Sequence, residues 1–347
     1  MPINKKNAIF MYRVARNILY HKLNKSYPII VALLANYRCN EKCIFCGHPS
    51  RAYMGGLPTE EIFELIDQID ELKIPFCSVS GGEPLLRSDI VEIGDYLLEK
   101  NIKNSLNTNG TLITKDLARQ LSGSYESIVV SLDGLKKTHE QLRGVKNCFE
   151  STMRGIEYLH SAKDTNLVGI NFVLNKYNYN DLIPLTKLLL KKKLVDFIRI
   201  TAVKHEKDLK PPIDETRAII NHILKIKKKH PQFIKPSEEL LMKIPRFFSG
   251  EYFPCDAGKL YCTIAPNGDV YVCDFINEAF PLGNFRNQKL KYILKSERMK
   301  EVDRIKSQCG GCLFEFAIGF SDVLNSSPLE LAKNIPKFIK DGYYLHH

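Results

Sequence analysis

The chain has 347 residues, of which 44% are hydrophobic and 26% charged, and its formal net charge is +11. This composition excludes a disordered or fibrous protein, and the length suffices for one large domain and a smaller one. No apolar run reaches the roughly 18 residues that a membrane-spanning helix needs, and the N-terminus lacks the cleavage site of a secretory signal. We therefore expect a cytoplasmic protein, in which cysteines bind metals more often than they form disulfides.

The positive charge suits an acidic protein, an anionic membrane surface or nucleic acid as a partner. A solvated, lysine-rich surface is the simpler explanation. The sequence has no basic strand with interleaved aromatic residues and no zinc-finger spacing. We therefore expect no nucleic-acid partner.

In chain order, residues 1–27 carry an amphipathic basic helix, and residues 28–203 alternate apolar strand patterns with helical patterns. Such alternation is typical of right-handed βαβ units and a parallel sheet. Six strands are fewer than the eight of a closed barrel, so we expect an α/β fold, a partial (β/α)6 TIM-like barrel over 28–205. The strands are predicted at 28–37, 75–80, 102–110, 125–134, 166–175 and 195–203. The helices between them are predicted at 59–73, 89–101, 114–123, 148–162 and 179–193.

The alternation stops after residue 203. We expect a helical linker at 206–254, a small cysteine-rich domain with short strands at 255–315 and a C-terminal helix at 316–347. Within the barrel, polar or glycine-rich turns follow four of the strands: the cysteine loop, "GGEP", "NTNG" and "SLDG". Because the carboxyl ends of parallel strands meet at one edge, these turns predict a ligand site there.

Three of the ten cysteines, Cys39, Cys43 and Cys46, follow the first strand with the spacing C-x3-C-x2-C. Three thiolates can anchor three irons of a four-iron cluster and leave the fourth iron open to a small molecule. Catalytic zinc also uses three protein ligands. The spacing alone therefore fits both metals, and the turns after the next strands distinguish them.

The order of these turns resembles the radical S-adenosylmethionine (radical SAM) superfamily. The resemblance covers residues 28–205 and rests on the three cysteines with Phe45 before the last, and on "GGEP", "NTNG", "SLDG" and the "RG" at 143–144. It implies a [4Fe–4S] cluster whose open iron is chelated by S-adenosylmethionine (SAM). It further implies reductive cleavage of SAM to a 5′-deoxyadenosyl radical that abstracts hydrogen from a substrate.

The resemblance also implies a set of cofactor contacts. The cluster ligands are Cys39, Cys43 and Cys46. The expected SAM contacts are Phe45 and Val203 at adenine, Asn107 and Ser131 at ribose, Gly81, Gly82 and Glu83 at the methionyl amino group, and Arg143 at its carboxylate. Glycine suits close approach of a backbone to a ligand, and arginine suits a carboxylate.

Each polar residue of this set has a structural alternative. Glu83 and Asn107 are common turn residues, and Arg143 would also serve in an ion pair. Asp133 is explained by a turn as well as by a ligand contact. His48 and His139 are expected at the surface or around the site.

A second cysteine group contains "PNGDVYVC", which predicts a hairpin with an Asn-Gly turn. Its spacing resembles the auxiliary-cluster module of radical SAM enzymes with a SPASM or shortened twitch domain. No cysteine follows the "CGGC" that ends the group, so the resemblance implies one auxiliary [4Fe–4S] cluster closed by Cys255, Cys273, Cys309 and Cys312. Structural zinc is the alternative metal. Cys262 is either a buried spare thiol or a replacement for one of the four.

A fully ligated auxiliary cluster suggests an electron conduit. We expect an oxidoreductase in which the substrate radical is oxidised through this cluster, by dehydrogenation or bond formation on a small alcohol or sugar, or on a peptide. These substrates follow from a resemblance to amine-sugar alcohol dehydrogenases and peptide-modifying enzymes of the superfamily. Oxidation at a hydroxyl-bearing carbon needs a base, and no catalytic residue stands out. The candidates are Arg199, Lys204, His205 and Asp208, each otherwise a surface residue.

Two other functions stay open. The basic helix within 1–27 resembles the leading segment of radical enzymes that act on isoprenoid or polycyclic lipids, and such a helix can lie on a membrane surface or simply cap the barrel. A non-catalytic iron–sulfur or zinc protein is the second alternative, and it predicts no cleavage of SAM. The net charge of +11 favours an acidic flavodoxin or ferredoxin as electron donor.

Overall fold

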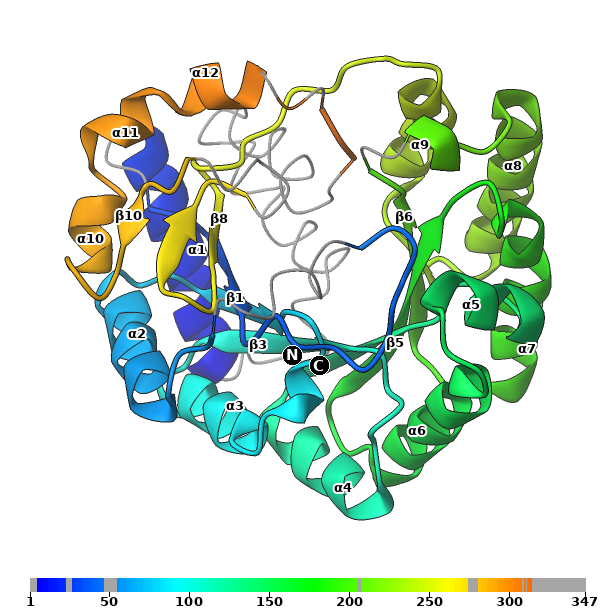
Figure 1. The fold of residues 1–347 in the computed structure, drawn as a ribbon, viewed down its shortest axis with the longest axis horizontal. Helices are drawn as coiled ribbons and strands as arrows, with labels where there is room; N and C mark the ends of the chain where they lie inside the picture. Colours follow the sequence, from blue (N-terminus) through cyan, green and yellow to red (C-terminus); the bar gives the residue numbers. More distant parts are fainter. Residues whose placement is uncertain are drawn as a thin grey trace.

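The computed structural model describes residues 5–22, 27–46, 55–204, 207–273, 280–307, 309 and 311–313. These residues form a ten-stranded, mostly parallel sheet that curves inside a ring of helices (Figure 1). This arrangement confirms the expected α/β partial barrel. The helix expected at 316–347 and the candidates His48 and His205 lie outside the described residues.

Six parallel strands form the barrel wall, and each pairs with the next in chain order. The first of them, "IVALL", is buried along its whole length, as expected of a strand that is covered on both faces. The strands are β1 (Ile30–Leu34), β2 (Phe76–Ser80), β3 (Lys103–Thr108), β4 (Ser127–Ser131), β5 (Leu167–Leu174) and β6 (Phe197–Ala202).

Helices cover the outer face of this wall (Figure 1), and apolar side chains of the strands join those of the helices in one hydrophobic core. One helix, at 136–143, was not predicted, because it is short, mostly polar and has few buried residues. The helices are α2 (Thr59–Glu71), α3 (Ile90–Glu99), α4 (Lys115–Ser124), α5 (Lys136–Arg143), α6 (Cys148–Ala162) and α7 (Leu182–Lys192). Short 3-10 turns lie at Pro84–Leu86, Tyr179–Asp181 and Lys207–Leu209.

Helix α1 (Lys5–Lys22) packs into the same core. Its residues Phe10, Val14 and Ile18 are buried, and Arg13 forms an ion pair with Asp70 of α2. Part of the apolar face that suggested membrane contact therefore packs inside the protein, while Tyr12 and Leu19 of α1 stay exposed. Membrane contact stays a prediction. Among the described helices, none combines the length and the apolarity that crossing a bilayer requires.

After β6 the chain adds strands to both edges of the sheet. Helix α8 (Ile213–Lys229) leads to β7 (Ile234–Lys235), which pairs with β6 and is followed by α9 (Glu238–Phe248). The region expected as a helical linker therefore also contributes a strand. A two-residue strand is too short to leave a periodic signal in the sequence.

At the other edge, β8 (Tyr261–Ile264) pairs parallel with β1, and β9 (Asp269–Tyr271) and β10 (Gly283–Asn284) extend the sheet antiparallel. The cysteine-rich region is thus continuous with the barrel sheet, and β8 pairs with the edge of β1 that would otherwise expose its backbone. The remaining helices are α10 (Leu290–Ile293), α11 (Glu297–Lys300) and α12 (Val302–Ser307).

Candidate active site

The cysteine loop leaves the carboxyl end of β1 and is held by the end of α5. The backbone N–H of Lys42 donates to the carbonyl oxygen of Arg143 at 3.0 Å, and that of Ile44 donates to the carbonyl oxygen of Leu142 at 3.0 Å. These hydrogen bonds hold the loop on both sides of Cys43. The position of this thiol is therefore set by two backbone contacts.

The three thiols of the loop are close enough to affect one another's ionisation. Burial raises the pKa of Cys43 to about 12, and the charges of Glu41 and Cys46 add to the rise. Burial also raises the pKa of Cys39, again with Cys46 among the contributors. Two N–H donors face the sulfurs: Glu41 N lies 3.4 Å from Cys39 Sγ, and Arg143 Nη1 lies 3.6 Å from Cys43 Sγ. Since a metal displaces the thiol proton, these donors and sulfurs fit a thiolate-bound cluster.

The Gly81–Gly82 pair follows β2 and lies against the backbone that leads into the cysteine loop. A Cβ atom at Gly82 would lie 2.2 Å from the carbonyl oxygen of Arg38, and one at Gly81 would lie 2.4 Å from that of Asn36. The sequence motif predicts that these glycines admit the methionyl group. In the structure, the space of the missing side chains is filled by the chain's own backbone.

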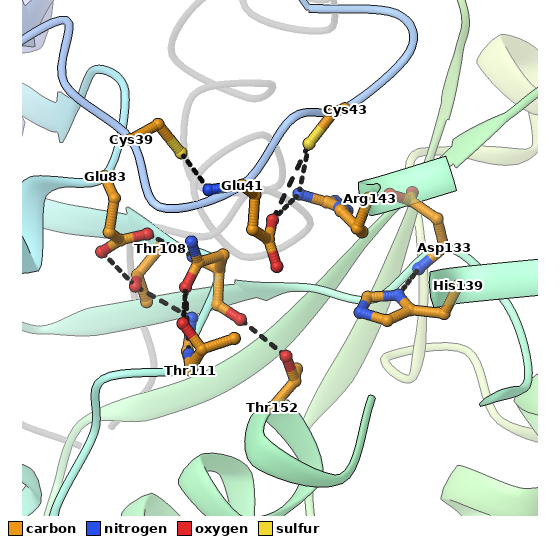
Figure 2. Close-up of polar contacts among 12 residues, drawn as sticks. Cys39, Glu41, Cys43, Glu83, Thr108, Thr111, Asp133, His139, Arg143 and Thr152 are labelled. Atoms are coloured by element: carbon orange, nitrogen blue, oxygen red, sulfur yellow. Dashed lines mark hydrogen bonds and ion pairs between the residues drawn. The ribbon is translucent and has the colours of Figure 1, made fainter. Parts of the chain in front are cut away.

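Glu83 is completely buried at the start of the next turn. Its Oε1 accepts hydrogen bonds from Leu85 N at 3.0 Å and from the hydroxyl of Thr108 at 2.6 Å, and its Oε2 accepts one from Asn109 N at 2.7 Å (Figure 2). Burial raises the pKa of Glu83 to about 7. Because a carboxylate oxygen can accept two hydrogen bonds, Oε2 retains a lone pair that these donors do not use. Contact of Glu83 with the ammonium group of SAM stays a prediction.

Arg143 is buried among charged groups beside the cysteine loop (Figure 2). Its guanidinium forms an ion pair with Asp133 and, at 3.2 Å, with Glu41. Asp133 Oδ1 also accepts a hydrogen bond from Val173 N at 2.7 Å. The sequence motifs predict Arg143 as a partner of the SAM carboxylate. They leave open whether Asp133 stabilises a turn or contacts a ligand. The structure gives Arg143 two carboxylate partners within the chain and makes Asp133 an anchor between α5 and β5.

The other predicted SAM contacts lie on neighbouring elements. Asn107 on β3 and Ser131 at the end of β4 are half-buried. The ring centroid of Phe45 lies 5.7 Å from the guanidinium carbon of Arg143. Val203 directly follows β6 and is buried in the hydrophobic core. Contact of these four residues with SAM stays a prediction.

The described base candidates lie in different surroundings. Asp208 is exposed and Lys204 is half-buried just beyond β6. Arg199 is buried on β6, in register with Asn171 of β5 and Lys235 of β7. Because a guanidinium keeps its proton at neutral pH, Arg199 is suited to bind an anion and not to remove a proton.

The second cysteine group gathers beside β8, β9 and the helices that follow them. Burial raises the pKa of Cys255 to about 11, and the thiols of Cys312 and Cys309 add to the rise. Cys273 and Cys312 are buried, whereas Cys255 and Cys309 are partly exposed. Ala257 N donates to Cys255 Sγ at 3.3 Å. The thiols of Cys255, Cys309 and Cys312, three of the four predicted ligands, are thus close together. As in the first group, an N–H group donates to one of the sulfurs.

The remaining cysteines are structural. Cys77 of β2 and Cys262 of β8 flank Val31 of β1 in register, and both are fully buried. Cys148 is buried at the start of α6. None of the ten cysteines forms a disulfide. The structure favours the spare-thiol alternative for Cys262, because this thiol lies within the sheet.

Sequence reasoning missed one residue of the site, Glu41, which is 1% exposed although an acidic residue in a loop is usually solvated. Of the two positions expected for His139, the structure excludes the surface. The residue is completely buried, and its Nδ1 accepts a hydrogen bond from Asp133 N at 3.1 Å. The available signal for Glu41 was its place between two cysteines of the triad, but spacing does not reveal burial.

Two protein-family models match this sequence. The model described as the radical SAM superfamily matches residues 34–189, which include the cysteine loop and the turns after β2, β3 and β4. The model described as the SPASM iron–sulfur cluster-binding domain matches residues 255–313, which include the second cysteine group. The two matches therefore coincide with the two groups of thiols.

Individual relatives agree with these matches. The chain is 36% identical to the Fe-coproporphyrin III synthase of Methanosarcina barkeri over 171 residues, which span 48% of this chain and only 42% of that protein. It is 27% identical to the AdoMet-dependent heme synthase of the same organism over 83% of this chain and 89% of that protein. The solved structure of Streptococcus suis SuiB bound to S-adenosylmethionine is similar with a TM-score of 0.67 at 21% identity, covering 91% of this chain and 76% of that one. This last likeness supports the fold.

Proposed function

Because the chain belongs to the radical SAM superfamily and carries a C-terminal SPASM iron–sulfur domain, we propose that it is an oxidoreductase that dehydrogenates its substrate or forms a bond in it. The first cluster and SAM, when bound, supply the radical that abstracts a hydrogen atom, and the auxiliary cluster accepts the electron that oxidation releases. The main support is the division of the thiols into a group of three and a group that can supply four. The substrate would be a small alcohol or sugar, or a peptide.

The residues around the first group prepare the site for its cofactors. The N–H groups of Glu41 and Arg143 donate to two of the three sulfurs, which stabilises the thiolate form that binds iron. The glycine pair keeps the cysteine loop against the turn after β2. The lone pair left on Glu83 Oε2 would accept the ammonium group of SAM, and Asn107 and Ser131 would contact the ribose.

The second group would hold its cluster through Cys255, Cys273, Cys309 and Cys312. Four protein ligands leave no iron open to a substrate, so this cluster is suited to electron transfer. The pairing of β8 with β1 places its domain on the same sheet as the cysteine loop. This continuity supports a fixed path for the electron from the substrate site.

The electron donor is expected to be an acidic flavodoxin or ferredoxin. The net charge of +11 favours association with a protein of opposite charge. Reduction of the first cluster by flavodoxin should therefore slow as salt concentration rises, because ions screen this attraction. A rate that does not depend on salt would speak against such a donor.

The central experiment is anaerobic reconstitution of the whole chain. Two [4Fe–4S] clusters predict about eight irons and about eight sulfides per chain. Incubation with dithionite and SAM should yield 5′-deoxyadenosine and methionine. Zinc in place of iron at the first cysteine group, or iron without any 5′-deoxyadenosine, would overturn the proposed function.

A further inference from the structure

A cluster of buried charged and polar side chains lies beside Cys43. Glu41 is 1% exposed, Arg143 is 6% exposed, and Asp133 and His139 are completely buried. Buried charges are costly unless they are paired and hydrogen-bonded. The arrangement of this cluster therefore indicates what each member contributes to the loop.

Arg143 connects the cluster to the sulfur of Cys43. Its Nη1 lies 3.6 Å from Cys43 Sγ and 3.2 Å from Glu41 Oε2, while Nη2 pairs with Asp133. The same oxygen of Glu41 lies 3.7 Å from Cys43 Sγ. The sulfur thus has one cation and one carboxylate as close neighbours.

His139 approaches Glu41 from the other side. Its Nδ1 accepts a hydrogen bond from Asp133 N at 3.1 Å, so the proton of a neutral ring must be on Nε2. Burial lowers the pKa of His139 to about 3, with the nearby charge of Arg143 as a second cause, which keeps the ring neutral. Figure 2 shows Nε2 on the side of the ring that faces Glu41. This nitrogen and Glu41 Oε1 are both buried, and neither makes a hydrogen bond among the described residues.

These groups do not form a cation site, although a carboxylate oxygen, an imidazole nitrogen and the Cys148 sulfur lie within 4.8 Å of one another. The lone pair of His139 Nδ1 is used by Asp133, and Nε2 carries a proton and has no lone pair for a metal. The guanidinium of Arg143 would also repel a cation. The charge of the Glu41 carboxylate is therefore balanced by Arg143 and not by a bound cation.

We propose that Glu41 is a positioning residue that sets the reduction potential of the radical cluster through Cys43. Its carboxylate pairs with the guanidinium of Arg143 and holds that guanidinium at the sulfur. An N–H···S contact stabilises the more negative, reduced cluster, and the carboxylate charge beside it opposes reduction. This inference rests on the proposed function, because it takes Cys43 as a cluster ligand.

The test is a redox titration of the reconstituted whole chain, followed by electron paramagnetic resonance. SAM perturbs only the cluster with an open iron, so its signal is distinguished from that of the auxiliary cluster. In Glu41→Gln the amide oxygen can still accept a hydrogen bond from Arg143, while the negative charge is lost. The midpoint potential of the SAM-responsive signal should therefore move to more positive values. The auxiliary signal should not move. Equal potentials in the two proteins would overturn the proposal.

A matched control and a second measurement complete the test. Glu64 is exposed on α2, and Glu64→Gln should leave both potentials unchanged. In the unmutated protein labelled with ¹⁵N-arginine, pulsed resonance should detect a nitrogen coupling to the SAM-responsive cluster. Absence of this coupling would overturn the proposal without any variant. Neither measurement needs turnover, whereas failure of the proposed function would appear as a lack of 5′-deoxyadenosine.

Discussion

The two cysteine groups lie on one continuous sheet but in different surroundings. Cys255 and Cys273 pack with the main hydrophobic core, whereas Cys43 has the buried charges of Glu41 and Arg143 as direct neighbours. A cluster that only transfers electrons needs ligands and exclusion of water. A cluster that must also admit a charged cofactor needs fixed charges around it. This contrast agrees with the proposal that the first group holds the reactive centre and the second group the conducting one.

The largest effect that would test this contrast is expected when one ligand of the first cysteine group is removed. Cys43→Ala should lower the iron content from about eight to about four per chain and abolish formation of 5′-deoxyadenosine, because the auxiliary cluster has no open iron. Metal analysis and chromatography of the nucleoside measure both quantities. Continued cleavage of SAM would show that the open iron lies elsewhere.

Removal of the second cluster should have a narrower effect. The double variant Cys309→Ala/Cys312→Ala should also retain about four irons, but it should still form 5′-deoxyadenosine while the oxidised product disappears. Mass spectrometry of the substrate detects this loss. If the double variant also stops cleaving SAM, the two centres are not independent and the contrast fails.

A substitution in the glycine pair tests the backbone that positions the first group. A Cβ at Gly82 would lie 2.2 Å from the carbonyl oxygen of Arg38, so Gly82→Ala should lower the free energy of unfolding by about 3 kcal/mol. Denaturant titration under anaerobic conditions measures the change. A Cβ added to Gly123 on α4 would meet no described atom within 4 Å, and Gly123→Ala should be neutral or stabilise by up to ~1 kcal/mol. Equal effects of the two would contradict the prediction.

The smallest expected effect concerns Glu83, whose oxygens accept from Leu85 N, Thr108 and Asn109 N. In Glu83→Gln the amide group would face one of these donors with N–H groups of its own. The free energy of unfolding should therefore fall by about 2 kcal/mol, while the iron content stays unchanged. Thermal unfolding of the reconstituted protein with metal analysis checks both. A protein as stable as the original would show that the buried carboxylate has no structural role.

Most of the barrel could be predicted because its signals are local. Helix α6 was expected at 148–162 and is found at Cys148–Ala162, since its apolar residues recur at helical spacing. Pairing across long sequence separations leaves no such signal. The contact of β8 with β1 and the addition of β7 to β6 were therefore not predicted.

The metal ligands of the site could be predicted from the sequence, but the arrangement of the residues around them could not. Cysteine spacing indicates three thiolates near one metal whatever the rest of the chain does. The burial of Glu41 and the ring orientation of His139 depend on α5, a short polar helix that places both beside Arg143. Glu83 combines both cases, since its motif suggested a ligand contact while its environment gives it three donors from the chain.

The parallel pairing of β8 with β1 also has a consequence for biogenesis. The ribosome releases β1 long before β8, so one edge of β1 keeps unmatched amide and carbonyl groups until β8 has emerged. Such edges invite strand addition by other polypeptides. We expect the emerging chain to need chaperone protection during this interval.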